Sequence, residues 1–330
     1  MTKMNAEIKA QLISIGSVDV DESLLSRPSA SSAGPGTGQK SVFFKSGGHR
    51  VRLEISKESP LKIKKANGEF IILKDDKELA RGELEPILAH CPEQAYITLS
   101  EQCIYDCKFC SVPKLQGKIK TLEEVIAIVE NALKTGRLKV IALTSGIANS
   151  PEDEIDRVVQ TVKALKKYNV PIGVSVHPTE DSSIRLKEAG VAEIKYNVET
   201  MDRAIFQQVC IGRKGHSLDH ILESLRDAVQ VFGRNKVSTN FIIGLGETDE
   251  CVRQGVEYLA KIGVIPILRP ITIPPLRKGE LAATRPSAER LLKLTKMTHE
   301  ILDKYGLGVE VSQTMCLPCT GCDLTPFRDL

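Results

Sequence analysis

From Ala95 onward the sequence alternates between short apolar runs and longer segments with helical periodicity, and this alternation restricts the fold more than any other feature. The apolar runs are AYITLS, VIALTSG, IGVSVH, EIKYNVE, VSTNFIIG and IPILRP, and the helical segments that follow them are 121–136, 152–168, 180–189, 218–232, 249–262 and 287–305. Such strands between helices indicate an α/β fold with a parallel sheet covered by helices. Right-handed crossovers would curl six such units into a partial (β/α)6 barrel. A complete eight-unit barrel is the alternative, but the remaining sequence offers no two further strands.

The residues ahead of the alternating region have a different character. Residues 4–15 have apolar side chains at helical spacing and predict one short amphipathic helix. The segment RPSASSAGPGTGQ is rich in Gly, Pro and Ser, and predicts a loop or linker. Short alternating runs follow at 41–45, 50–55, 61–65 and 69–74, and Asn67-Gly68 between the last two is a strong hairpin signal.

These patterns divide the chain into four expected parts. We expect an N-terminal helix and flexible linker over 1–40, a small β-rich extension over 41–90, the partial barrel over 91–308 and a cysteine-rich tail over 309–330.

Composition excludes several classes of function. The chain has 330 residues, of which 42% are hydrophobic and 26% charged, as in a globular protein with a sizeable core. A net charge of +3, with only 4% aromatic residues and no basic block between aromatics, argues against a nucleic-acid partner. No run of eighteen apolar residues spans a membrane, and MTKMNAEIKAQL lacks the apolar core of a signal peptide. The nine cysteines therefore indicate metal chemistry in a reducing cytoplasm.

Three cysteines stand close together directly after the first predicted strand of the barrel. Cys103, Cys107 and Cys110 have the spacing C-x₃-C-x₂-C, with Phe109 before the third. Three thiolates can bind three irons of a 4Fe–4S cube, which leaves the fourth iron open to a small molecule. A structural zinc site uses four ligands, typically as two separated pairs, so it fits this spacing less well.

A second cysteine triplet lies at the C-terminus, in MCLPCTGCD. Cys316, Cys319 and Cys322 suit an auxiliary 4Fe–4S cluster, with zinc as the alternative. The fourth ligand of such a cluster could be Cys91, in HCPE before the first barrel strand, a non-cysteine group, or none. A redox disulfide would leave one cysteine over. Cys210 and Cys251, which stand alone, are expected to be packed free thiols.

The first triplet resembles the signature of the radical S-adenosylmethionine (SAM) superfamily, and the resemblance covers about residues 95 to 305. It implies a partial radical SAM barrel whose open iron chelates the amino and carboxylate groups of SAM. One electron from the cluster then splits SAM to a 5′-deoxyadenosyl radical. The cysteine loop follows the first strand, at the carboxyl edge of the sheet where barrel sites are built.

The resemblance also assigns residues to the SAM pocket. LTSG, with Ser145 and Gly146, corresponds to the motif whose backbone binds the SAM ammonium. YNVETMDR resembles the fourth-strand segment of lipoyl and biotin synthases, in which Asn197 and Glu199 would face SAM. By the same resemblance Arg213 would pair with the SAM carboxylate, and Gly244 and Gly246 of IGLGET would let the backbone approach the adenine. Arg269 in PILRP would lie in or beside the pocket.

An auxiliary cluster beside a SAM site is the arrangement of sulfur-inserting enzymes. The chain resembles the biotin synthase-related group, and within it the archaeal two-protein lipoyl synthases. This implies sulfur insertion into an octanoyl chain on a carrier such as a lipoyl domain or H-protein, with a sacrificial auxiliary cluster. It also implies an electron donor such as ferredoxin and, as one option, a second radical SAM protein that shares the work. Ordinary lipoyl synthases carry the auxiliary cysteines ahead of the radical motif, whereas this chain carries them behind the barrel.

Other interpretations remain open at this point. One is a biotin synthase, and another is a radical SAM enzyme of cofactor maturation or peptide modification that uses the C-terminal cluster as an electron relay. The last is a non-catalytic iron–sulfur carrier, which would have no use for the SAM-pocket motifs.

Overall fold

The computed structural model describes the chain except for residues 1, 26–28, 31–38, 116 and 213–216. The six apolar runs form one parallel sheet, hydrogen-bonded in the order β8-β10-β11-β12-β14-β15. Its strands are β8 (Gln94–Thr98), β10 (Val140–Thr144), β11 (Ile172–Ser175), β12 (Glu193–Lys195), β14 (Val237–Ile243) and β15 (Ile265–Pro270). Thr144 pairs with Thr98 on one side and Ser175 on the other, so the carboxyl ends of these strands meet at one edge. The predicted six-unit partial barrel is confirmed.

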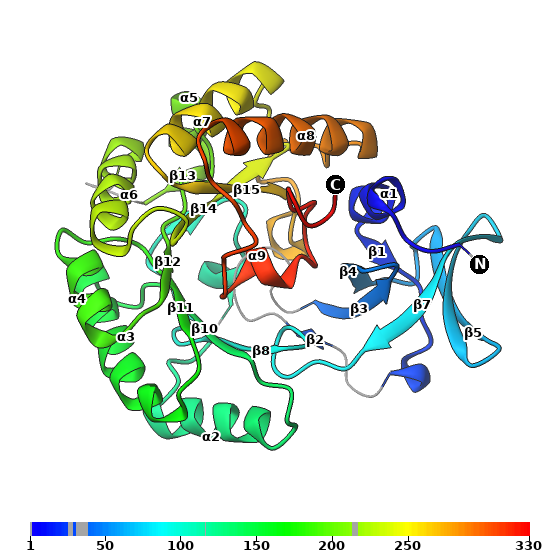
Figure 1. Ribbon diagram of the computed structural model, residues 1–330, viewed down its shortest axis with the longest axis horizontal. Helices are drawn as coiled ribbons and strands as arrows, with labels where there is room; N and C mark the ends of the chain where they lie inside the picture. The colour runs from blue at the N-terminus through cyan, green and yellow to red at the C-terminus, as the bar shows by residue number, and fades with distance from the viewer. Residues whose placement is uncertain (1, 26–28, 31–38, 116, 213–216) are drawn as a thin grey trace.

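Helices cover the outside of this sheet (Figure 1). They are α2 (Leu122–Leu133), α3 (Pro151–Leu165), α4 (Ser182–Ala189), α6 (Leu218–Phe232), α7 (Asp249–Lys261) and α8 (Ala288–Lys304). The structure also contains a short helix, α5 (Arg203–Val209), which the apolar pattern did not predict. Most of these helices begin at a Ser or Thr whose hydroxyl accepts a backbone N–H of the first turn; Thr121 forms a complete capping box with Glu124. Short 3₁₀ turns lie at Glu22–Leu24, Val112–Lys114, Lys166–Tyr168 and Pro275–Arg277.

The N-terminal part contains helix α1 (Ala6–Ile15) and a separate sheet. The strands are β1 (Ser17–Val18), β2 (Ser29–Ala30), β3 (Lys40–Ser46), β4 (His49–Ile55), β5 (Leu61–Ala66), β6 (Glu69–Lys74) and β7 (Lys77–Glu85). They run in the order β1-β4-β3-β7-β6-β5, with β2 paired to β3. The hairpin at Asn67-Gly68 is confirmed, since both residues have positive φ, at 52° and 84°, between the antiparallel strands β5 and β6. Strand β7 was missed because only Ala80 of its nine residues is buried.

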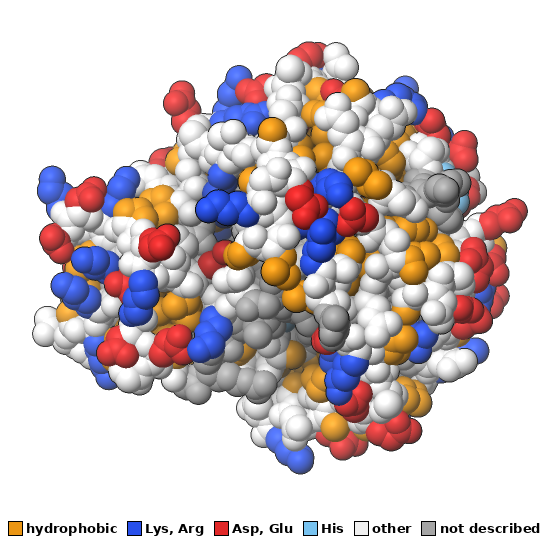
Figure 2. All heavy atoms as spheres, turned by 180° about the vertical axis from the view of Figure 1, so that it is seen from behind, with side chains coloured by type: hydrophobic (Ala, Val, Ile, Leu, Met, Phe, Trp, Pro, Cys, Tyr) orange, Lys and Arg blue, Asp and Glu red, His pale blue; other side chains and the backbone are white. Residues whose placement is uncertain are grey.

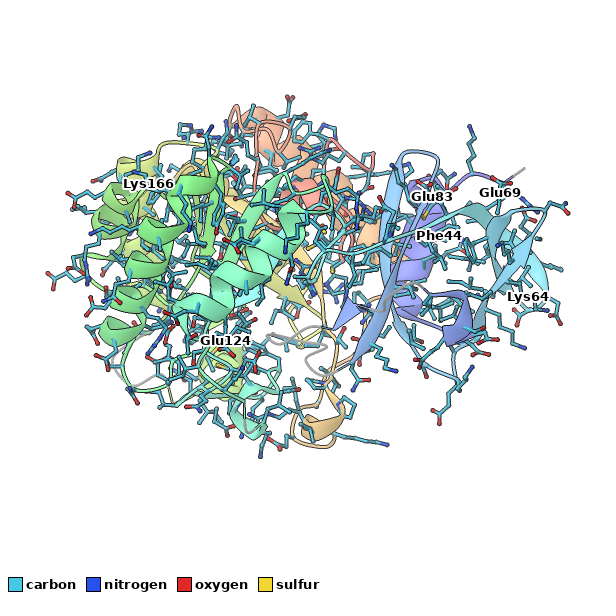
Figure 3. All side chains as sticks on the ribbon, turned by 90° about the horizontal axis from the view of Figure 1, so that it is seen from below. Phe44, Lys64, Glu69, Glu83, Glu124 and Lys166 are labelled. Atoms are coloured by element: carbon cyan, nitrogen blue, oxygen red, sulfur yellow. The ribbon has the colours of Figure 1, made fainter. Side chains whose placement is uncertain are left out.

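The two parts lie side by side (Figure 3). Phe44, Lys64, Glu69 and Glu83 belong to the N-terminal sheet, whereas Glu124 and Lys166 lie among the barrel helices on the other side. Each part has its own large hydrophobic cluster, and Leu291 of α8 and Leu324 of the tail join the N-terminal one. The tail therefore packs against both parts.

The tail lies between the barrel and the N-terminal sheet, with its short helix α9 (Cys316–Cys319) near the middle of Figure 1. On the barrel side, the backbone N–H of Thr314 donates to the Glu193 carboxylate at 2.8 Å. On the other side, the N–H of Arg52 in β4 donates to the carbonyl of Gly321 at 2.6 Å. Residues of both the barrel and the N-terminal sheet thus fix the position of the second cysteine triplet.

Charged groups of both signs are interspersed on the face seen in Figure 2. Within the described part of the chain, no helix combines the length and apolar character needed to cross a membrane.

Candidate functional site

A cavity of about 670 Å³ extends from the interior of the barrel to the N-terminal sheet. All six cysteines of the two triplets line it, and so does Cys91. Its wall also contains five predicted pocket residues, which are Ser145, Gly146, Asn197, Glu199 and Arg269, together with Phe109. Segments that are far apart in the sequence therefore meet around one space.

The first triplet sits on a loop between β8 and α2 that the backbone holds from several sides. Strand β9 (Asp106–Cys107) pairs antiparallel with β13 (Cys210–Ile211), so Cys107 lies opposite Cys210. The N–H of Ile104 donates to the carbonyl of Ile147 at 2.7 Å, and the N–H of Cys110 donates to that of Cys107 at 3.0 Å. Cys210, expected to be a packed thiol, is buried.

A buried arginine after the last barrel strand fastens the same loop. The Arg277 guanidinium donates to the backbone carbonyl of Cys110 at 2.9 Å, to Asp106 at 2.5 Å and to Glu280 at 2.7 Å. The Arg277 side chain is fully buried. Sequence reasoning missed this residue, because one arginine in the run PPLRKGE has no local signal that distinguishes it from a surface arginine.

The environment of the first triplet suits thiolates bound to a metal cluster. Burial raises the pKa of the Cys110 thiol to about 12, and the like charges of Cys107, Cys103 and Glu199 add to this. Thiols in such a place stay protonated unless a cation compensates their charge, which bound iron does. Three sulfur donors on the wall of one cavity, with Phe109 packed beside them, therefore fit the 4Fe–4S cluster that the sequence predicts.

Ser145 and Gly146 bring the end of β10 against the cysteine loop. The N–H of Ser100 donates to the Ser145 hydroxyl at 2.9 Å, and that hydroxyl donates to Glu154. The N–H of Gly146 donates to the carbonyl of Ser100 at 2.9 Å, and a Cβ on Gly146 would overlap the carbonyl oxygen of Gln102. The glycine thus has a packing role, and the contact of this turn with SAM stays a prediction.

Asn197 and Glu199 lie past the end of β12 and face the cavity. The side-chain carbonyl oxygen of Asn197 accepts the N–H of Asn240 in β14 at 3.2 Å. Glu199 is only 6% exposed and has a φ of 62°, a left-handed conformation that non-glycine residues seldom adopt. Backbone bonds to Asn240 and Ile242 hold it there, at 3.0 and 2.7 Å. Strained backbone of this kind is concentrated at functional sites.

Several residues of the IGLGET turn have structural roles. Glu247 accepts the N–H groups of Gly244 and Leu245, each at 2.8 Å, and pairs with Arg290. Gly244 and Gly246 both have a φ of 110°, and a Cβ on Gly244 would overlap the carbonyl of Thr284. Neither glycine belongs to the cavity lining among the described residues, so their approach to adenine stays a prediction. Arg213 lies outside the described residues.

The second triplet faces a group of buried cations. Lys195 Nζ lies 3.3 Å from the sulfur of Cys316, and Arg269 Nη1 lies 3.2 Å from Asp323. Burial alone would lower the pKa of Lys195, but Cys316 and Tyr96 raise it. The pKa of His90 falls to about 3 because of burial and then of Arg52, Arg269 and Lys195, so its imidazole is neutral. Arg269 thus lies at the second triplet rather than at the first.

The tail is held so that its cysteines face the barrel. Glu193 accepts the N–H groups of Gln313 and Thr314 and the hydroxyls of Ser312 and Thr314, at 2.7 to 3.0 Å. Gln94 donates to the carbonyl of Met315 at 2.8 Å. His90 and His177 also line the cavity.

In the described segments, no three His, Cys, Asp or Glu side chains converge on a point as ligands of one ion would. An iron–sulfur cube takes each thiolate on a different iron, so its ligands stand apart.

The sequence of the barrel region is similar to that of known proteins. Residues 97–259 match the profile described as "Radical SAM superfamily". The chain is 30% identical over 210 residues to a biotin synthase of Hydrogenobaculum sp., and 31% identical over 160 residues to one of Aquifex aeolicus. These matches cover 60% of the chain and 60% of the first relative, and 46% of each for the second. The chain thus spans about half the length of the biotin synthases that it matches.

Three further proteins are similar over 64% to 79% of the chain. A probable GTP 3′,8-cyclase of Saccharolobus islandicus is 25% identical over 247 residues, which are 70% of the chain and 78% of that protein. Among solved structures, a radical SAM methyltransferase from Sphaerobacter thermophilus is similar with a TM-score of 0.52 at 18% identity, covering 79% of the chain and 81% of the other. The FeFe-hydrogenase maturase from Carboxydothermus hydrogenoformans gives a TM-score of 0.53 at 19% identity, covering 64% and 52%. At these identities the structural likeness concerns the fold alone.

Proposed function

The chain is a radical SAM enzyme related to biotin synthases, and on this premise we propose that it inserts sulfur into an unactivated C–H bond. The substrate that the sequence motifs favour is an octanoyl chain on a carrier protein, so the product would be the lipoyl group or an intermediate of it.

The observation that carries the proposal is the shared cavity. Both cysteine triplets line the same space of about 670 Å³, which also takes in the predicted SAM residues. A substrate carbon in this cavity would lie within reach of the SAM site on one side and of a second sulfur-rich site on the other. Such an arrangement supports a division of labour between hydrogen abstraction and sulfur delivery.

The residues of the chain would divide the work accordingly. Cys103, Cys107 and Cys110 would hold the SAM-binding cluster, which when bound supplies the electron that cleaves SAM. Asn197 and Glu199 would bind SAM, since an amide and a carboxylate offer the polar contacts that its ribose and ammonium need. The apolar wall would keep water from the radical, because side chains such as Phe109 and Tyr105 are buried beside the cysteines.

Partners belong to the same proposal. The octanoyl group would be carried on a lipoyl domain or an H-protein, a ferredoxin would supply electrons, and a second radical SAM protein could share the two insertions. A sulfur-donating auxiliary cluster would be consumed, so turnover without repair would be limited to about one equivalent of product per site, because each cluster holds few sulfides.

Anaerobic assay of an octanoyl-lysine peptide tests the proposal. The reduced, reconstituted protein with SAM should release 5′-deoxyadenosine and form a thiolated peptide. Protein reconstituted with heavy-isotope sulfide should give heavy product. Cys319→Ser should still cleave SAM but form no thiolated product. Product that forms without the heavy isotope would refute sulfur delivery from the protein and favour the electron-relay alternative.

A second candidate follows from the GTP 3′,8-cyclase relatives, because the match covers 78% of that protein. The buried Lys195 and the half-buried Arg52 and Arg269 on the cavity wall would suit a nucleoside triphosphate. The same assay with GTP in place of the peptide distinguishes the candidates: a GTP-dependent increase in 5′-deoxyadenosine, with no thiolated peptide, would favour this one.

A further inference from the structure

We propose that Cys91 is the fourth thiolate of a metal–sulfur site completed by Cys316, Cys319 and Cys322. The proposal rests on the auxiliary site of the proposed function and adds the ligand that closes it. The sequence left three possibilities for that ligand, which were Cys91, a non-cysteine group or none.

The first support is the position of Cys91 against the tail. Cys91 is 3% exposed and packs with Cys319, Phe43 and Ile87 in a small buried cluster separate from the two main cores. Cys91, Cys316, Cys319 and Cys322 all line the cavity, and so do Arg52 and Arg269. Four sulfur donors from two distant segments thus face one space.

The second support is the way in which the two segments are joined. The side chain of Gln94, three residues after Cys91, donates to the carbonyl of Met315, which precedes Cys316. Arg50 donates to the carbonyl of Cys319 at 3.3 Å and also pairs with Glu85 and Glu93, on either side of Cys91 in the sequence. These bonds keep Cys91 and the triplet together before any metal binds, as a preformed site requires.

The third support is charge. Lys195 is 2% exposed, and the Nε and Nη2 atoms of Arg52 are buried without a hydrogen-bond partner. Arg269, which also lines the cavity, pairs with Asp323. Buried cations are costly unless anions compensate them. Four protonated thiols would add no negative charge here, whereas a four-thiolate metal site carries net negative charge and would help to balance the cations.

Cys251 provides the matched comparison. It is a cysteine on α7 that is partly exposed, stands outside the cavity lining of the described residues and is expected to bind nothing. If Cys91 is an ordinary packed thiol, its replacement should affect metal content no more than the replacement of Cys251 does.

The experiment uses the full chain with Cys103, Cys107 and Cys110 replaced by Ala, so that only the second site can bind a cluster. The protein is reconstituted anaerobically with iron enriched in the isotope that Mössbauer spectroscopy detects. The iron, zinc and sulfide contents per chain are then measured. We expect about four irons per chain, the content of one cube. Adding Cys91→Ala should lower the iron content, and the isosteric Cys91→Ser should give a spectrum in which one iron has a non-sulfur ligand. Adding Cys251→Ala should change neither.

Each result decides one claim. Unchanged iron content and an unchanged spectrum in both folded Cys91 variants would overturn Cys91 as a ligand while leaving the auxiliary cluster in place. Stoichiometric zinc that is lost with Cys91→Ala would support the four-thiolate site but refute the iron–sulfur part of the proposed function. If Cys91→Ala fails to fold by circular dichroism, the Cys91→Ser spectrum alone decides.

Discussion

The guanidinium of Arg277 donates to the backbone carbonyl of Cys110 at 2.9 Å. The same side chain bridges Asp106 and Glu280, at 2.5 and 2.7 Å, and is completely buried. One arginine from the loop after β15, the last strand of the barrel, therefore fixes the loop after β8, the first. Because β8 and β15 are the two edges of the described sheet, this contact also ties the open sides of the barrel together.

Replacement of Arg277 by Ala should loosen the cysteine loop. Loss of a hydrogen bond to a charged group costs about 1.5–3 kcal/mol. We expect faster loss of iron to a chelator, an altered electron paramagnetic resonance spectrum of the reduced cluster, and a raised KM for SAM with a smaller change in kcat.

Arg277→Lys should restore little of the iron retention or SAM affinity that Arg277→Ala loses. A lysine keeps the charge but lacks the forked guanidinium that reaches three acceptors. The matched control is Arg253→Ala, which removes an exposed arginine paired with Glu250 and Glu257 on α7. Wild-type iron retention and an unchanged spectrum in Arg277→Ala would show that the loop holds its shape without this residue.

Glu199→Ala should weaken SAM binding and leave the iron content intact. Glu199 is buried at the cavity wall, and removal of a charge-assisted hydrogen bond there would lower affinity about ten- to a hundredfold. Equilibrium binding of SAM to the reconstituted protein measures the change. Glu83→Ala, on the far N-terminal sheet, is the control. Equal affinity in both variants would remove Glu199 from the SAM site.

Much of the fold could be predicted from the sequence, because the residues that local periodicity marks as apolar are the ones that pack in the core. The six apolar runs became the six barrel strands, and Thr121, Ser217 and Ser287 begin helices where a capping hydroxyl was available. Strand β7 was not readable, since its charged residues pair with neighbours and bury little apolar surface. Its place depends on β3 and β6, between which it completes the sheet.

The candidate site could be predicted only in part, because sequence patterns record local spacing and not tertiary contacts. Cysteine spacing is local, so both triplets were found, and the structure brings them to one cavity. The contacts of Arg277 with Cys110 and of Cys91 with Cys319 join residues more than 160 positions apart, and no local pattern records such pairs. The cations at the second triplet, from β4, β12 and β15, likewise depend on tertiary structure.

The carboxyl group of Glu154 should make stability depend on pH. Burial raises the pKa of Glu154, and its bond from Ser145 and the nearby Arg157 only partly oppose this. A carboxyl with a raised pKa binds its proton more tightly in the folded state, so its contribution favours folding below the unfolded pKa and is lost as pH rises through the folded one.

Glu154→Gln should therefore remove this loss of stability with rising pH in the mildly acidic range, and the variant should be more stable than the wild type above that range. Urea unfolding of the wild type and the variant at several pH values measures the difference. A variant whose pH profile parallels that of the wild type would show that Glu154 is ionised at little cost.

The buried ion pair between Lys9 and Asp329 should decide whether the tail stays in place. Lys9 Nζ lies 2.6 Å from Asp329 and also donates to the carbonyl of Thr320, and both charged side chains are at most 2% exposed. Lys9→Met would leave Asp329 buried beside His49 without its main partner, and breaking a buried pair costs about 3–5 kcal/mol. The exposed pair Lys40–Glu22 provides the control, since Lys40→Met should cost about 0–1 kcal/mol. Because the tail carries Cys316, Cys319 and Cys322, Lys9→Met should also lower the iron content of the second site while the first keeps its cluster. Denaturant unfolding and iron counts on both variants test this, and equal losses of stability in the two would mean that the pair of Lys9 with Asp329 does not hold the tail in place.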